Sequence, residues 1–232
     1  MNPNISTISD DEAILFLAEA VKHKGTDASI RKATRNSTMI VLMLDAGLRV
    51  GEIVQLTRNM LVMFGEPVQA IAIAATMTKN KRARTIPLTD SCKKALQVMN
   101  AIIWQQDGCG FEDYAFYSHR PNHPLTTRQV ERIVLGIAVR SINRPIHPHT
   151  LRHTFATRLM RKVSLPIIQK LLGHKFLSST QVYTHPDQQD LQSAIETMNE
   201  STAKMKADRL SLPSGADSPN HSEAGRTDKD LC

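Results

Sequence analysis

The stretch between residues 149 and 185 holds side chains whose types and spacing suit chemistry on a phosphate ester. His149 and Arg152 stand three residues apart, so they share one face of a helix. His174 follows a Leu-Leu-Gly sequence, and Tyr183 stands nine residues after it. An arginine fork binds phosphate oxygens without losing its charge, and a phenol becomes a nucleophile when nearby cations help it to ionise. These four side chains are therefore candidates for one phosphoryl-transfer site.

Two cationic candidates lie upstream, and each has a structural alternative. Arg49 follows a glycine typical of a helix end and would begin the next helix, where backbone N–H groups also favour an anion. The alternative for Arg49 is a salt bridge with Glu52, and the sequence does not decide between the two. Lys79 lies in a basic run that is either a hairpin tip reaching DNA or a solvated turn. Spacing alone does not select Lys79 over Lys81.

Metal-dependent chemistry is the main alternative for the histidines. Four of them gather in this part of the chain: His147, His149, His153 and His174. No acidic residue or cysteine stands at ligand spacing with them, so the sequence favours a site without metal. The three cysteines, Cys92, Cys109 and Cys232, are odd in number and share no ligand spacing, which indicates reduced thiols.

The charge of the chain favours a polyanionic partner. The 232 residues carry a net charge of +7, but the segment from Ser211 onward holds four acidic and two basic side chains. Residues 1–210 therefore carry +9, which suits nucleic acid, the alternative being a merely soluble basic surface. No apolar run reaches membrane-spanning length and no charged-then-apolar leader is present, so we expect a soluble cytoplasmic protein without membrane partners.

Capping signals and hydrophobic periodicity predict an α+β domain that is mainly α-helical. The predicted helices are Ala13–Lys22 behind a capping box at Ser9, Ile30–Asp45, Arg49–Leu56, a helix from Thr89 to about Gln106, Thr127–Val139, one around His149, one opening at Pro166, and Gln188–Lys206. The predicted strands are Met60–Phe64, Val68–Ala75 and Arg84–Pro87, which would form a small three-stranded antiparallel sheet.

Five segments in order resemble the signature of the tyrosine recombinase, or phage integrase, family. They are Gly47–Glu52, Lys79–Pro87, His149–Thr157, Leu171–His174 and Thr180–His185. The resemblance covers about Ser9 to Pro186 and implies an integrase-like catalytic domain. The catalytic set that it implies is Arg49, Lys79, His149, Arg152, His174 and Tyr183. Alignment of the hairpin back from Pro87 is what selects Lys79 over Lys81.

The resemblance also implies a mechanism for site-specific DNA recombination or integration, typically for a mobile element. Tyr183 would attack a phosphate of DNA and form a 3′-phosphotyrosyl bond, while Lys79 protonates the leaving 5′-oxygen. The two arginines would hold the phosphoryl group with His174, and His149 would assist proton transfer. One phosphate ester replaces another, so no metal, ATP or other cofactor is implied.

Double-stranded DNA is the implied partner, bound by a homotetramer. The basic residues expected to contact it are Lys81, Arg82, Arg84, Arg128 and Arg132. We expect a catalytic domain at 1–187, a C-terminal helix at 188–210 and a disordered tail at 211–232. The helix would dock onto a neighbouring protomer, as in the family, or pack on its own domain. The family's N-terminal clamp domain has no counterpart here, so we expect weaker DNA affinity and a partner protein that supplies the clamp.

Two other functions compete with recombination. One is a DNA-binding accessory or regulator that descends from a recombinase and no longer cleaves. The other is a topoisomerase-like enzyme that reseals the same strand and so relaxes DNA. The complete set of six residues argues against lost catalysis, but it does not separate strand exchange from relaxation. The target sequence, the direction of the reaction and the accessory proteins leave no trace in the sequence.

Overall fold

Side-chain caps set where the helices begin. The computed structural model describes residues 7–78 and 81–173, and its first helix, α1 (Asp10–Ala20), opens on the predicted capping box. The Ser9 hydroxyl accepts from the backbone N–H of Glu12 at 3.1 Å, and the Glu12 carboxylate accepts from that of Ser9 at 2.9 Å. Threonine side chains also accept a backbone N–H at the start of three more helices, at Thr26, Thr89 and Thr126, and Thr126 forms a second capping box.

The described part of the chain is mainly helical, as predicted. Its further helices are α2 (Asp27–Asp45), α3 (Val50–Ile53), α4 (Asp90–Met99), α5 (Thr127–Ile142), α6 (Pro148–Met160) and α7 (Leu165–Leu172). Short 3₁₀ turns lie at η1 (Arg58–Met60) and η2 (Ala75–Met77), and α4 continues into the π-helical segment η3 (Asn100–Trp104). Pro166 stands in the first turn of α7, where its missing N–H costs nothing.

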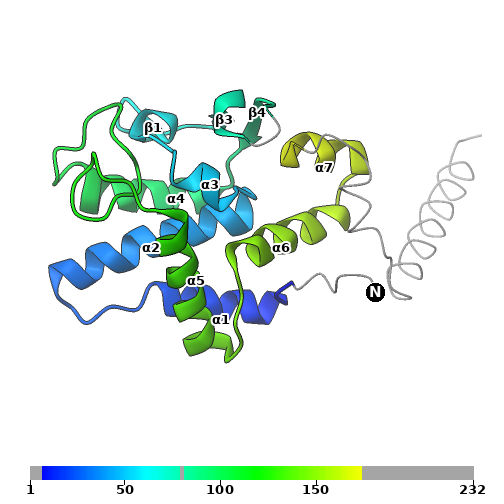
Figure 1. Ribbon diagram of the computed structural model, residues 1–232, viewed down its shortest axis with the longest axis horizontal. Coiled ribbons are helices and arrows are strands. Elements are labelled where there is room, and N and C mark those ends of the chain that lie inside the picture. Colours follow the sequence, from blue (N-terminus) through cyan, green and yellow to red (C-terminus); the bar gives the residue numbers. More distant parts are fainter. Residues whose placement is uncertain (1–6, 79–80, 174–232) are drawn as a thin grey trace, which may run out of the picture. The chain divides into compact units, whose positions relative to one another are not determined.

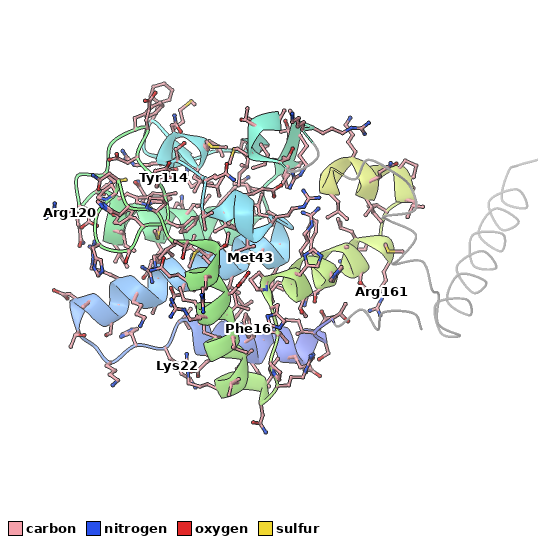
Figure 2. The ribbon with its side chains drawn as sticks, viewed as in Figure 1. Phe16, Lys22, Met43, Tyr114, Arg120 and Arg161 are labelled. Atoms are coloured by element: carbon pink, nitrogen blue, oxygen red, sulfur yellow. The ribbon has the colours of Figure 1, made fainter. Side chains whose placement is uncertain are left out.

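Helix α2 is the centre of the hydrophobic core. It contacts α1, α4 and α6, and the ribbon shows α4 on one side of it and α1 on the other (Figure 1). Met43 of α2 and Phe16 of α1 are fully buried among these helices (Figure 2). The apolar run in α2 thus explains the arrangement, because several neighbours bury their stripes against this one helix.

The strands form two separate antiparallel ribbons instead of one three-stranded sheet. One pairs β1 (Val62–Met63) with β2 (Glu66–Pro67), and the other pairs β3 (Ala70–Ile73) with β4 (Arg84–Pro87). The reason is the turn at Phe64 and Gly65, whose φ angles are both positive. Such a two-residue turn closes a tight hairpin, so β1 pairs with β2 before β3 begins.

Gly47 lets α6 approach the turn between α2 and α3. Its φ is +62°, and an added Cβ would lie 2.2 Å from Cδ1 of Phe155 on α6. Neither the backbone angle nor the space admits a side chain. This close approach brings Arg49, the N-cap residue of α3, next to α6.

The described residues, 7–78 and 81–173, belong to one compact unit. Over residues 7–78 and 81–173, no helix has both the length and the apolar character that crossing a membrane requires. The predicted C-terminal helix at 188–210 and the tail at 211–232 lie outside the described residues.

Candidate active site

The two predicted catalytic arginines meet at a single oxygen atom. Nη2 of Arg49 donates to the backbone carbonyl of Leu172 at 3.2 Å, and Nη2 of Arg152 donates to the same carbonyl at 2.6 Å. Arg152 also donates to the carbonyl of Gly47. The start of α3, the first turns of α6 and the end of α7 therefore converge on one point, although they are far apart in sequence.

A buried carboxylate anchors this cluster. Glu52 is 1% exposed, and it accepts from the backbone N–H of Arg49 at 2.8 Å and from its Nη1 at 3.0 Å. The salt bridge of Arg49 is thus compatible with its predicted catalytic role, because the two use different nitrogens of one guanidinium group. Arg84 grips the same carboxylate through two bonds of 2.7 Å each. This bidentate pair is the strongest form of a charged hydrogen bond.

The cluster carries an excess of positive charge. Burial by itself would raise the pKa of Glu52, but the hydrogen bonds and charge of Arg84, with the Arg49 backbone and the Arg152 charge, hold that pKa below its usual range. Glu52 is therefore ionised at neutral pH and balances one of the three guanidinium groups. Arg49 and Arg152 add positive charge to the cluster and both donate to one carbonyl oxygen, an arrangement that suits a bound anion.

His149 stands in the first turn of α6, on an exposed position beside the arginines. Its ring makes an edge-to-face contact with His153, with centroids 4.5 Å apart and an interplanar angle of 82°. Partial desolvation and the charges of Arg152 and Arg49 lower the pKa of His149. Its imidazole is neutral at neutral pH and so suited to accept a proton.

His153 is expected to make stability depend on pH. Burial and the nearby His149 and Arg152 lower its pKa to about 4, against about 6.5 in an unfolded chain. Between those values the unfolded chain binds more protons, so the free energy of unfolding falls as pH drops from 7 towards 4. Urea unfolding at pH 7 and pH 5 should show this loss, and His153→Gln should remove a large part of it. An equal loss in both proteins would contradict the assignment.

The predicted DNA-contacting residues fall into two groups. Lys81, Arg82, Arg128 and Arg132 are exposed, as DNA contacts require. Arg84 lies elsewhere: its side chain is 3% exposed and is bonded to Glu52 and to the carbonyl of Leu171. The structure therefore corrects its expected place on the DNA-facing surface, because a guanidinium buried in this way does not reach a duplex.

The remaining catalytic candidates, Lys79, His174 and Tyr183, lie outside the described residues. The structure brings Arg49, His149 and Arg152 together, and it adds Glu52 and Arg84, which are not in the catalytic set that the resemblance implies. Alternation along β4 is a signal that finds Arg84, because Arg84 and the core residue Ile86 share one face of a strand. Within residues 7–78 and 81–173, no three His, Cys, Asp or Glu side chains form a cluster able to hold a metal ion.

Known proteins match both the sequence and the fold. The chain is 37% identical over 170 residues to a tyrosine recombinase of Pseudothermotoga lettingae, and 34% identical over 176 residues to the tyrosine recombinase XerC of Bacillus subtilis. Each match covers 72% of this chain and 55% of the relative. The chain thus spans about half the length of these relatives.

Two solved recombinases share its fold. The crystal structure of XerA recombinase superposes with a TM-score of 0.67 at 27% identity, covering 84% of this chain and 66% of that one. The XerH site-specific recombinase bound to palindromic difH substrate gives 0.66 at 25% identity, covering 85% and 54%. Both confirm the predicted integrase-like, mainly helical fold.

The resemblance read from the five sequence segments is confirmed by a match over most of the chain. Residues 16–190 fit the sequence pattern of the phage integrase family, a range that contains all six predicted catalytic residues. The convergence of Arg49 and Arg152 agrees with a shared phosphate-binding point. The chain belongs to the phage integrase family.

Proposed function

We propose that this chain cleaves and rejoins double-stranded DNA at specific sites as a tyrosine-type recombinase, through a covalent 3′-phosphotyrosyl intermediate. The observation that carries the proposal is the meeting of Arg49 and Arg152 at the carbonyl oxygen of Leu172. Guanidinium donors that converge from two elements favour an oxygen with negative charge over a neutral carbonyl. A non-bridging oxygen of the cleaved phosphate would take the place of that carbonyl as acceptor.

The chemistry follows from the charge that develops at phosphorus. As the Tyr183 oxygen attacks, its proton passes to the neutral His149, and negative charge grows on the non-bridging oxygens. Arg49 and Arg152, with His174, stabilise that charge. Lys79 gives a proton to the departing 5′-oxygen, which leaves a 5′-hydroxyl and a 3′-phosphotyrosyl bond. Attack by a 5′-hydroxyl of a partner strand reverses the steps without ATP or metal, since one phosphate ester replaces another.

The proposal extends to partners. The family relative XerH has been solved bound to its palindromic difH substrate. We infer a duplex partner for this chain, held by Lys81, Arg82, Arg128 and Arg132, which are all exposed. A homotetramer on DNA, a catalytic domain ending near residue 187 and a partner protein that supplies a DNA clamp belong to the same proposal.

A nicked DNA substrate tests the proposal. When the nick lies close to the cleavage point, the short strand diffuses away after attack and the covalent protein–DNA adduct accumulates. We expect an adduct that survives denaturation, forms in EDTA without ATP, and joins the 3′ end of DNA to the peptide that contains Tyr183. DNA binding without any adduct would favour an accessory DNA-binding protein. Relaxation of one plasmid without exchange between two sites would favour a topoisomerase-like enzyme.

A further inference from the structure

We propose that Arg84 is a positioning residue for the catalytic arginine pair: it saturates Glu52 and fixes the end of α7, and thereby sets where Arg49 points. This inference rests on the proposed function. It gives Arg84 a part in the reaction although its side chain is buried.

The contacts of Arg84 join three elements. Its Nη1 and Nη2 donate to the two carboxylate oxygens of Glu52 on α3, each at 2.7 Å. Its Nε donates to the carbonyl of Leu171 at the end of α7, at 2.9 Å. Leu172 also lies at the end of α7, and its carbonyl accepts hydrogen bonds from Arg49 and Arg152. Arg84 thus fixes two groups that bind Arg49: the carboxylate of Glu52 and the chain segment that contains the Leu172 carbonyl.

The close fit around Arg84 leaves it little freedom. Its Cδ lies so near Gly173 that an added Cβ there would be 3.1 Å from it, and Gly173 has a φ of +64°. Its side chain is 3% exposed and that of Glu52 is 1% exposed. A buried pair of charges is retained only when the geometry of its hydrogen bonds is good, and it is costly to break on one side.

Because Arg84 binds both carboxylate oxygens of Glu52, Nη2 of Arg49 remains available to bind another oxygen. Arg84 occupies both carboxylate oxygens, so Arg49 makes one side-chain bond to Glu52 and directs Nη2 towards Leu172. If Arg84 were absent, the vacant lone pairs of a buried carboxylate would attract both nitrogens of Arg49. The guanidinium group would then turn away from the phosphate position.

Lysine does not replace arginine in this place. An ammonium group is a single donor centre and does not span two carboxylate oxygens and a carbonyl in one plane. Arg84→Lys keeps the charge but loses the fork, so it separates the effect of geometry from that of charge. Glu52→Gln keeps the shape of the carboxylate and removes its charge, so it tests the same link from the other side.

The experiment compares cleavage of two nicked substrates by the full chain. One has a normal phosphate at the cleavage point, and the other has a neutral methylphosphonate, which lacks the anionic oxygen. With phosphate, Arg84→Lys should lower the rate of adduct formation about 10- to 100-fold, as is common when a supporting residue is lost. With methylphosphonate the loss should be within about 3-fold, because little charge remains for Arg49 to stabilise. Glu52→Gln should show the same selective loss.

Arg144→Lys is the matched control. Arg144 also binds both oxygens of one carboxylate, that of Glu12, through Nε and Nη2 at 2.7 Å each, and it links the end of α5 to the start of α1. Arg144→Lys should lower the melting temperature without a selective loss on the phosphate substrate. Equal losses on both substrates in Arg84→Lys, or cleavage equal to that of the wild type, would overturn the inference.

A readout without catalysis separates this inference from the proposed function. The Nη groups of a guanidinium held by two hydrogen bonds rotate slowly, and ¹⁵N NMR measures that rotation for Arg49. Arg84→Lys and Glu52→Gln should both change the rotation rate and the Nε shift of Arg49, and Arg144→Lys should change neither. If the wild type forms no adduct, the proposed function fails. If Arg49 is unaffected by Arg84→Lys, the positioning role fails by itself.

Discussion

Tyr183→Phe should abolish the covalent adduct with nicked DNA, lowering its rate of formation by more than about 10⁴-fold. The substitution removes one oxygen atom, the one that the proposal bonds to phosphorus. Affinity for the uncut duplex should stay within about 3-fold, because phosphate contacts by lysine and arginine supply most of that affinity. Denaturing electrophoresis of labelled DNA measures the adduct, and a gel-shift titration at fixed salt measures the affinity.

Tyr114→Phe supplies the control for the loss of a phenol oxygen. Tyr114 is 36% exposed, lies in the loop before α5 and carries no part of the proposed site (Figure 2). It should form the adduct at the rate of the wild type. An adduct that persists in Tyr183→Phe would remove Tyr183 as the nucleophile and with it the reaction proposed for this family member.

Local signals predicted the described elements well, because each depends on few neighbouring residues. The capping box at Ser9 opens α1, and β4 spans Arg84–Pro87 as the sequence predicts. The strand pairing differed, because it depends on φ angles at Phe64 that an aromatic residue seldom adopts. No local sequence pattern predicts such a turn.

The sequence predicted which residues form the site better than it predicted the contacts between them. The motif order selects Arg49, His149 and Arg152, and the structure brings these three together. The contact between Arg84 and Glu52 joins residues 32 positions apart, and charge alone assigned Arg84 to the DNA surface. A buried ion pair of this kind depends on two elements that are distant in the sequence, so the pattern of one segment does not predict it.

Arg49→Gln should lower adduct formation about 10²- to 10³-fold, the cost typical of removing one donor that stabilises transition-state charge. The side chain of Arg49 is 26% exposed, so its loss should disturb folding less than loss of the buried Arg152. Arg84 would still hold Glu52, which keeps the carboxylate paired in the variant. The melting temperature therefore separates a defect of chemistry from a defect of folding.

The neutral substrate sharpens this prediction. On methylphosphonate DNA, Arg49→Gln and the wild type should differ by less than about 3-fold, because the charge that Arg49 stabilises is then largely absent. Arg161→Gln removes one positive charge at the opposite end of α6 from His149 and should leave both rates unchanged (Figure 2). A similar loss in Arg161→Gln would mean that overall charge, and not the position of Arg49, governs cleavage. Wild-type cleavage by Arg49→Gln would show that the point where the two arginines meet is not where the phosphate binds.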